Sequence, residues 1–278
     1  MISALVLTKN EETDLPRCLG SLKWCDDVHV FDSFSDDGTV DVARYLGARV
    51  TQRAFDHYAG QRNAALGSLS FRHDWVVSLD ADEIIPEALA NEMMEFVSQA
   101  PPNVVAARMR RRDFMWGKWL RHAQISPYYI RLFRPSRVRY EREINEILVP
   151  DGAVADLREA FDHHPFSKGL AAWIERHNRY SSMEAARAIA ERSNSGQFTI
   201  RNALFHSDFN VRRRHQKGIF YRLPGRPWLK FAYMLLWRRA LFDGRPGIAY
   251  ASLQAIYEHF IVIKERELLA SGSANRNQ

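Results

Sequence analysis

The sequence predicts an α/β fold in which a mainly parallel sheet is flanked by helices. Short apolar runs alternate with helical patterns through the first hundred residues, which is typical of strands joined by right-handed helical crossovers. Polar residues directly follow three of these runs. With 278 residues, 46% of them hydrophobic and 26% charged, the chain is long enough for one sizeable domain and an appendage.

Each element of this first part has a local signal. Short apolar runs predict the strands, and apolar residues at helical spacing predict the helices. We expect Thr39 to be the N-cap of one helix, and Gly47 lies near the end of that helix. The expected strands span 2–8, 28–33, 49–52 and 74–80, and the expected helices span 15–25, 39–48 and 59–69.

Beyond residue 103 the pattern becomes strand-like and then helical. Residues 168–193 carry an amphipathic helix with apolar residues on adjoining turns. Residues 226–270 alternate helical stretches with Pro and Gly breaks, and residues 271–278 are expected to be disordered. The expected strands of this part span 103–110, 128–134 and 145–150.

Cysteine usage and the amino-terminal residues predict a cytoplasmic protein. Cys18 and Cys25 have no second pair, so we expect reduced thiols rather than a disulfide framework or a zinc site. The stretch MISALVLTKNEE is typical of a core strand and not of a signal peptide. The longest apolar run, FAYMLLW, is far shorter than the roughly 20 residues of a membrane-spanning helix.

The positive charge belongs to one segment. The formal net charge is +6, yet the segment from Arg201 to Tyr250 contains eleven Lys or Arg and only two acidic residues. The rest of the chain is therefore slightly acidic. This asymmetry predicts a local anionic partner for the carboxyl-terminal segment.

Three polar clusters follow predicted strands: residues 8–11, Asp32 and residues 80–83. In open α/β sheets, ligands bind beyond the carboxyl ends of the strands. We therefore expect the three clusters to converge on one edge of the sheet.

The third cluster favours a cation. In WVVSLDADEII, Asp80, Asp82 and Glu83 come directly after a buried strand. Asp80 and Asp82 point to the same face of an extended segment, so both can reach one ion. Mg²⁺ prefers hard oxygen ligands and binds through one or two carboxylates together with phosphates. The alternative is an acidic turn that precedes a helix beginning near Pro86.

Three motifs in this order carry a family resemblance: LTKNEE, VFDSFSDDGT and SLDADE. With YYIRLFRP, INEILVPDG and HHPFSKGLAAWIERHNRYSSMEA, they resemble the family 2 glycosyltransferases, in particular bacterial lipopolysaccharide-core and exopolysaccharide transferases. The resemblance implies a glycosyltransferase-A fold, which is Rossmann-like, with a catalytic domain over 1–200 and a helical, basic and aromatic segment over 201–270. It also implies metal-dependent, inverting sugar transfer from a nucleotide-sugar, with UDP as the expected nucleotide.

The resemblance assigns roles to the polar clusters. Asp82 would ligate Mg²⁺ or Mn²⁺, which neutralises the departing diphosphate, and Asp80 would join that metal site or contact the ribose. Asp32 would accept a hydrogen bond from the N–H of uracil; a turn cap is the alternative for this residue. The other residues of the nucleotide pocket would be Thr8, Asn10, Glu11 and Arg62, unless Arg62 is only a solvated helix charge.

An inverting transfer also needs a base that accepts the proton of the acceptor hydroxyl. The dipeptide Asn145-Glu146 matches the pattern of the subgroup before a strand, so Glu146 is the expected base and Glu143 the reserve. The alternative is an exposed glutamate at a strand edge. His163 and His164 stay open between metal ligation and a structural role.

The resemblance implies a saccharide acceptor on a lipid carrier. Residues 219–247 mix aromatic residues and Leu with Arg and Lys, so apolar rings can enter the headgroup region while cations meet anionic lipid. We therefore expect peripheral binding to the inner face of a bacterial cytoplasmic membrane. The alternative is packing on the catalytic domain by Trp228, Phe231, Leu235 and Trp237.

Other function classes fit the sequence less well. A sugar-nucleotidyltransferase would carry a Gly-rich basic loop after the first strand, where LTKNEETDLP has no glycine. Nucleic-acid binding, suggested by a pI of 9.4 and by the run 212–214, leaves the carboxylates unexplained. An oxidoreductase would show G-x-G-x-x-G after the first strand. The basic stretch 108–114 is expected to be a solvated strand face, with binding of an anionic acceptor as the alternative.

Overall fold

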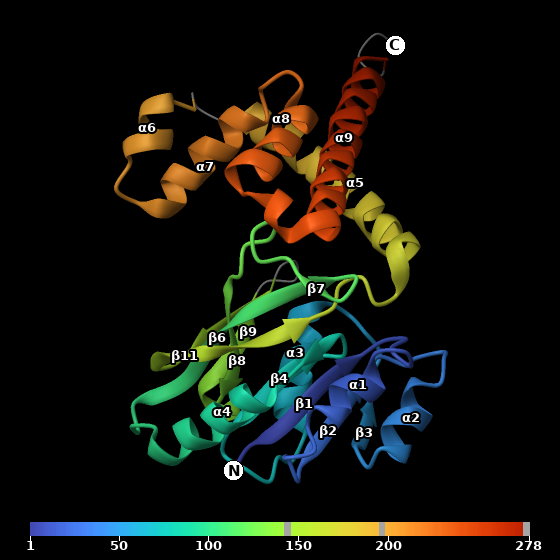
Figure 1. The fold of residues 1–278 in the computed structure, drawn as a ribbon, viewed down its shortest axis with the longest axis vertical. Helices are drawn as coiled ribbons and strands as arrows, with labels where there is room; N and C mark the ends of the chain where they lie inside the picture. The colour runs from blue at the N-terminus through green and yellow to red at the C-terminus, as the bar shows by residue number, and fades with distance from the viewer. Residues whose placement is uncertain (142–145, 195–197, 275–278) are drawn as a thin grey trace. The chain divides into compact units, whose positions relative to one another are not determined.

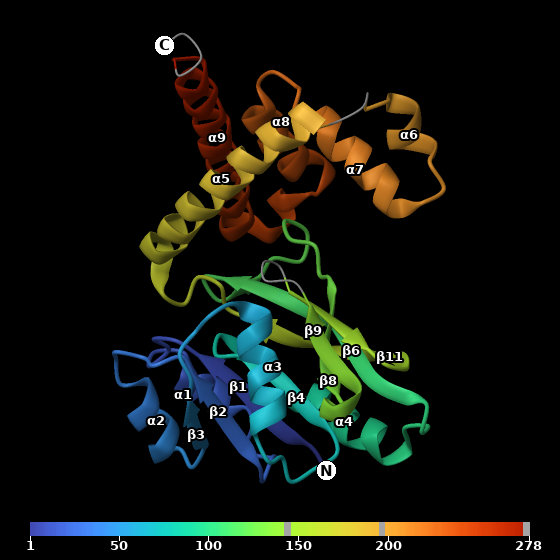
Figure 2. The same ribbon diagram turned by 180° about the vertical axis from the view of Figure 1, so that it is seen from behind.

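The computed structural model describes residues 1–141, 146–194 and 198–274. Figures 1 and 2 show the ribbon from opposite sides, coloured from the amino-terminal to the carboxyl-terminal end. The described residues fold into two compact units.

The first unit consists of Met1–Trp119 and Ile125–Ser167, and the second of Leu120–Gln124 and Lys168–Gln278. This division falls earlier in the chain than the expected boundary at residue 200. Helix α5 (Gly169–Asn194) belongs to the second unit, because its partner is the last helix of the chain.

The first unit is built on a mixed nine-stranded sheet with the order β3-β2-β1-β4-β8-β6-β11-β5, and β7 pairs with β6. β1 pairs in parallel with β2 and β4, and β2 with β3. β8 is antiparallel to β4 and β6, whereas β11 is parallel to β6. A two-stranded sheet joins β9 and β10. The strands are β1 Ser3–Thr8, β2 Val28–Asp32, β3 Arg49–Gln52, β4 Val76–Asp80, β5 Glu83–Ile84, β6 Val104–Met115, β7 Lys118–Trp119, β8 Tyr128–Phe133, β9 Val138–Glu141, β10 Ile147–Pro150 and β11 Ala153–His163.

Helices cover both faces of the parallel part of the sheet, as Figures 1 and 2 show. Ala4 and Val6 of β1 lie in one apolar cluster with residues of α1, α2 and α4, and Leu5 lies in another with Ala65 of α3. Because successive side chains of a strand point to opposite faces, β1 is buried on both. The helices of this unit are α1 Leu15–Gly20, α2 Thr39–Tyr45, α3 Tyr58–Ser68, α4 Glu87–Gln99 and the 3₁₀ turn η1 Pro135–Arg137.

The second unit is helical. Its long helices α5 and α9 are joined by Lys264, whose Nζ donates to the backbone oxygen of Asn178 at 2.5 Å and to Ser181 Oγ at 2.8 Å. The ring of His177 also packs edge-on against Tyr257, with 5.1 Å between centroids. The remaining elements are α6 Ile200–Phe205, α7 Phe209–Phe220, α8 Arg226–Ala232, the π-helical turn η2 Tyr233–Trp237, the 3₁₀ turn η3 Ala240–Asp243 and α9 Gly244–Ala274.

A short segment, Leu120–Gln124, belongs to the second unit although it lies in the sequence between β7 and β8 of the first unit. The buried carboxylate of Asp243 holds it. Asp243 Oδ2 accepts hydrogen bonds from the backbone N–H groups of His122 at 2.9 Å and Ala123 at 2.7 Å, and its Oδ1 lies 2.8 Å from His122 Nδ1. The chain therefore passes between the units three times.

Most predicted elements of the first unit are present within a few residues of their expected bounds, but two details differ. Thr39 is not the N-cap of α2: the cap position is Gly38, and Thr39 Oγ1 accepts from Glu11 N at 2.7 Å. Strand β11 was not predicted, because two register shifts interrupt its pairing with β6 and obscure its alternation. Gly47 adopts φ of 83° after α2, as its position near the helix end predicts.

Two further expectations concern chemistry and membrane crossing. Cys18 and Cys25 are both free thiols, as predicted. Within the described ranges, no helix combines the length and apolar character needed to cross a bilayer.

Arg226 is the central buried charge of the second unit. Its Nε lies 2.7 Å from Glu258 Oε1 and its Nη2 lies 2.7 Å from Glu265 Oε1. Nη1 donates to the backbone oxygen of Tyr221 at 3.0 Å. Only 2% of Arg226 is exposed, so this group links the start of α8 to the middle of α9.

We expect Arg226→Ala to lower the free energy of unfolding by about 3–5 kcal/mol, because it leaves two buried glutamates without their cation. Urea denaturation followed by circular dichroism measures the change. Arg245→Ala, which removes an exposed arginine of the same unit, should shift the midpoint only slightly. Equal midpoints for the two variants would contradict the assigned role of Arg226.

Candidate active site

The sheet register brings the predicted polar clusters together. Thr8 at the end of β1 pairs with Asp32 at the end of β2, and Leu7 pairs with Asp80 at the end of β4. The carboxyl ends of these parallel strands therefore lie side by side. The predicted convergence of the clusters on one edge is confirmed.

Asp32 is fully buried and bonded on both oxygens. Its Oδ1 accepts from Thr8 Oγ1 at 2.8 Å, and its Oδ2 accepts from the backbone N–H of Ser35 at 2.8 Å and from Gln52 Nε2 at 3.0 Å. Burial acts to raise the pKa of Asp32, but these hydrogen bonds outweigh it and leave the pKa below its usual range. A nucleobase that donates a hydrogen bond to this carboxylate must therefore replace one of the protein donors that the carboxylate already has.

The loops after β1 and β2 bind each other. Asn10 adopts the left-handed conformation with φ of 57°, its N–H donates to Ser35 Oγ at 2.8 Å, and its Oδ1 accepts from Asp36 N at 2.9 Å. Asp37 Oδ1 accepts from the backbone N–H of Thr39 at 3.0 Å. The stretch SDDGT thus forms a turn that leads into α2.

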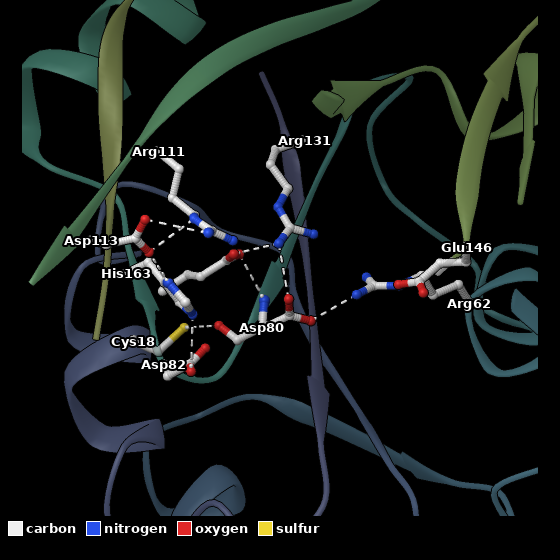
Figure 3. A network of polar contacts seen from close by, with 10 residues as sticks. Cys18, Arg62, Asp80, Asp82, Arg111, Asp113, Arg131, Glu146 and His163 are labelled. Atoms are coloured by element: carbon white, nitrogen blue, oxygen red, sulfur yellow. Dashed lines mark hydrogen bonds and ion pairs between the residues drawn. The ribbon is translucent and has the colours of Figure 1, made fainter. Parts of the chain in front are cut away.

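Asp80 lies between two arginines, as Figure 3 shows. Arg62 Nη2 of α3 donates to Asp80 Oδ1 at 2.8 Å, and Arg131 Nη2 of β8 donates to Asp80 Oδ2 at 2.9 Å. Burial acts to raise the pKa of Asp80, but the two cations hold it well below its usual range. The carboxylate therefore stays ionised, and each of its oxygens has a guanidinium partner.

Glu83 is buried beside this group. Its Oε2 accepts from the backbone N–H of Asp80 at 3.0 Å, and its Oε1 is paired with Arg131. Burial raises the pKa of Glu83 to about 7, and the neighbouring Arg131 opposes part of that effect. Glu83 thus fixes the backbone of the DADE turn.

Arg131 is a site residue that the sequence analysis did not identify. It is 8% exposed and lies in β8 between Ile130 and Leu132. The signal was an arginine inside an apolar strand, because a charged side chain facing the core needs a carboxylate partner. Its partners could not be named without the pairing of β8 and β4.

Asp82 faces His163, which ends β11. His163 Nε2 lies 3.3 Å from Asp82 Oδ2, and His163 Nδ1 lies 2.5 Å from Asp113 Oδ1. Pairing of His163 with Asp113 across β11 and β6 explains the second contact. Burial acts to lower the pKa of His163, but hydrogen bonds to Asp113 and Asp82 raise it to about 9.

The donor set at this point fits a divalent cation. Asp82 supplies a carboxylate and His163 an imidazole Nε2 on the same spot. Asp113 on the other ring nitrogen is the outer-sphere partner that metal-binding histidines commonly have. The described residues form no group of three or more such ligands, so phosphate oxygens and water would complete the coordination, as is usual for Mg²⁺.

Arg62 joins the acidic turn to Glu146. Its Nε lies 3.1 Å from Glu146 Oε1, and its guanidinium lies over the ring of Tyr140 at 5.4 Å from the centroid. Asn63 anchors the same part of α3 by hydrogen bonds of 2.8 Å to and from the backbone of Tyr140. Arg62 is 6% exposed, so it is not a solvated helix charge, and within the described residues its buried Nη1 has no hydrogen-bond partner.

Other candidates lie outside this group. Glu143, the reserve base, falls outside the described residues. The backbone N–H of His164 donates to the backbone oxygen of Asp82 at 2.9 Å, and its ring stacks on Phe114. These contacts give His164 a structural role next to the acidic turn.

The basic stretch of β6 is neutralised locally. Arg108 pairs with Asp156 and Arg112 with Asp162, both at 2.6 Å across β6 and β11. Arg110 Nε donates to the hydroxyl of Tyr128 at 2.9 Å. This pairing agrees with the expected solvated strand face.

Comparison with known families matches residues 3–163 to Glycosyl transferase family 2. The chain belongs to that family. The match begins with β1 and ends with His163, so it covers the whole edge described above. The fold of the first unit is accordingly the glycosyltransferase-A fold that the sequence motifs imply.

Relatives of this family member are bacterial. This chain is 29% identical to "Lipopolysaccharide core biosynthesis glycosyltransferase LpsC" of Rhizobium meliloti over 196 residues. The match covers 68% of this chain and 72% of the relative. An uncharacterized glycosyltransferase of Rickettsia conorii is 43% identical over 93 residues, but that match covers only 33% of this chain and 32% of the relative.

Among solved structures, glucosyl-3-phosphoglycerate synthase of Mycobacterium tuberculosis, crystallised with Mn²⁺, UDP-glucose and phosphoglyceric acid, is 24% identical with a TM-score of 0.35. The match covers 40% of this chain and 44% of the solved chain.

We expect Arg131→Leu to destabilise the protein by about 3 kcal/mol or more near pH 8, because buried Glu83 loses its cation. The raised pKa of Glu83 means that the folded state binds its proton more tightly than the unfolded state, so protonation stabilises the fold as the pH falls below about 7. The loss should therefore be smaller at pH 5.

Chemical denaturation at the two pH values measures this effect. Arg139→Leu, at an arginine whose side chain is 64% exposed, is the control and should change little at either pH. A loss for Arg131→Leu that is equal at both pH values would contradict the pairing with Glu83.

Proposed function

We propose that this protein transfers a sugar, with inversion and with the help of a divalent cation, from a nucleotide-sugar to a hydroxyl group of a saccharide. UDP is the proposed nucleotide. The observation that carries the proposal is the group of carboxylates and arginines at the ends of β1, β2 and β4, in a chain that belongs to Glycosyl transferase family 2. A thermal-shift screen of nucleotide-sugars with Mn²⁺ tests the donor class.

The donor would bind along the carboxyl edge of the sheet. Thr8 ends β1, and Asn10 and Glu11 follow it in the next loop. We propose that Asp32 receives the uracil N–H there. Arg62 is the proposed partner of the diphosphate, because its buried Nη1 has no hydrogen-bond partner among the described residues. A phosphate oxygen would satisfy that donor with a charge-assisted hydrogen bond.

The cation would be held by Asp82, with His163 as a second ligand. When bound, Mg²⁺ or Mn²⁺ would neutralise the negative charge that develops on the leaving diphosphate. Asp80 would belong to the same site without necessarily ligating the cation directly. Because both of its oxygens are paired with arginines, we propose that it contacts the ribose or a metal-bound water.

Glu146 is the proposed base. Its carboxylate would accept the proton of the acceptor hydroxyl as that oxygen attacks the sugar carbon on the face opposite the diphosphate. Arg62 Nε, 3.1 Å from Glu146 Oε1, would orient this carboxylate. Arg62 would thus hold the base and the donor end of the site in a fixed relation.

The acceptor is proposed to be lipid-linked, with the second unit resting on an anionic membrane surface. Trp228 and Trp237 are each 78% exposed, and Leu236 is 73% exposed. Packing within the second unit therefore leaves these three side chains largely exposed. Exposed rings near arginines suit the headgroup region of a bilayer.

We expect Asp82→Asn to weaken binding of UDP with Mn²⁺. Loss of an outer-sphere partner of a metal ligand typically costs about 10–100-fold in affinity, and loss of a direct ligand should cost at least as much. Isothermal titration calorimetry measures the affinity. The matched control is Asp162→Asn, which removes a carboxylate of β11 that pairs with Arg112. Unchanged affinity in Asp82→Asn would sink the metal assignment.

Glu146→Gln should keep donor binding and lose turnover by about a hundredfold or more, because the amide keeps the shape but cannot accept a proton. Release of UDP in the presence of a panel of saccharide acceptors measures turnover. Glu143→Gln is the comparison. If Glu146→Gln turns over normally and Glu143→Gln does not, the base is Glu143.

A further inference from the structure

A cavity of about 320 Å³ lies in the second unit, between the turn that follows α7, the start of α8 and one face of α9. The α9 residues that line it include His259, Ile263 and Arg266, which recur at helical spacing and so share one face. Arg222 and Trp228 also line the cavity. The cavity is at the lower end of the range for small-molecule sites.

The charges around this cavity are of two kinds. Arg226 at its base is neutralised by Glu258 and Glu265, each at 2.7 Å. Arg222 and Arg266, which also line it, are exposed and have no carboxylate partner among the described residues; the Arg222 guanidinium lies over the ring of Phe198 at 5.0 Å from the centroid. The cavity therefore offers two unneutralised cations above a buried, already paired arginine.

Apolar side chains surround the same cavity. Trp228 is 78% exposed, Ile263 50% and Leu269 47%. Exposed apolar side chains next to uncompensated cations complement a ligand that has an anionic head and an apolar tail. A free phosphate ion would engage the arginines only and leave these apolar side chains in water.

We propose that this cavity binds the phosphate headgroup of an anionic glycerophospholipid. Arg222 and Arg266 contact the phosphate, and the first methylenes of the acyl chains lie against Trp228 and Leu269. The proposal rests on the membrane association proposed above and makes it specific: one headgroup occupies one site, in addition to any diffuse attraction between the basic segment and the bilayer.

Sedimentation of the full-length protein with vesicles tests the site. Vesicles of phosphatidylcholine alone are compared with vesicles that also contain phosphatidylglycerol. Wild type should bind only the latter, and the double variant Arg222→Gln, Arg266→Gln should bind at least about tenfold more weakly. The charge-matched control is Arg238→Gln with Arg239→Gln, which removes two arginines of the same unit outside the cavity and should cost clearly less.

A second pair of variants tests the apolar contact. Trp228→Ala should weaken vesicle binding several-fold, whereas Trp116→Ala, at an exposed tryptophan of the first unit (66% exposed), should not. Equal weakening by the two arginine pairs would show a diffuse electrostatic attraction and overturn the headgroup site. Binding of soluble glycerol 1-phosphate that depends on Arg222 and Arg266, without binding to vesicles, would overturn the lipid as ligand.

The readout separates this proposal from the proposed sugar transfer. Titration with UDP and Mn²⁺ should give the same affinity for wild type and for the Arg222, Arg266 double variant. If all variants keep vesicle binding and UDP binding, the cavity proposal fails while membrane association and donor binding stand. If wild type does not bind anionic vesicles, membrane association fails with it, but the assignment of the sugar-transfer site is untouched.

Discussion

The pairing of Asp80 with Arg62 and Arg131 is the interaction on which the site depends. It joins the end of β4 to α3, the helix that precedes β4, and to β8, about fifty residues later in the chain. A carboxylate with a guanidinium on each oxygen stays ionised and fixed in direction. The turn after Asp80 carries Asp82 to His163 Nε2, and the other ring nitrogen of His163 pairs with Asp113.

The parallel part of the fold and its edge could be predicted from the sequence, because both follow from local patterns. Alternating strands and helices determine which ends meet, and the register of β1 with β2 and β4 places Thr8, Asp32 and Asp80 accordingly. The histidine beside Asp82 was harder to place. His163 was noticed, but its strand was not, since β11 pairs with β6 through two register shifts that no local pattern reveals.

Arg131 and Asp113 are buried charged residues whose partners could likewise not be predicted from the local sequence. Each is a charged residue inside a strand, and each is buried. Their partners lie about fifty residues away along the chain, so only the sheet order identifies them. In the second unit, the usual burial of apolar residues and exposure of charged ones is partly reversed. Arg226 and Glu265 are buried, whereas Trp228 and Trp237 are exposed. Composition alone predicted the mixture, but not which of these residues face inward.

The hold of Asp243 on His122 and Ala123 has a consequence for how the molecule can be divided. The family match ends at His163, which invites the view that everything after it is dispensable. Yet Leu120–Gln124, inside the matched region, belongs to the second unit. The backbone N–H groups of His122 and Ala123 donate hydrogen bonds to Asp243, some 120 positions later. A fragment cut at the end of the family match would still lack Asp243, the anchor for a loop in its own middle. The helical unit therefore supplies the hydrogen-bond acceptor for a segment, Leu120–Gln124, that lies inside the family match.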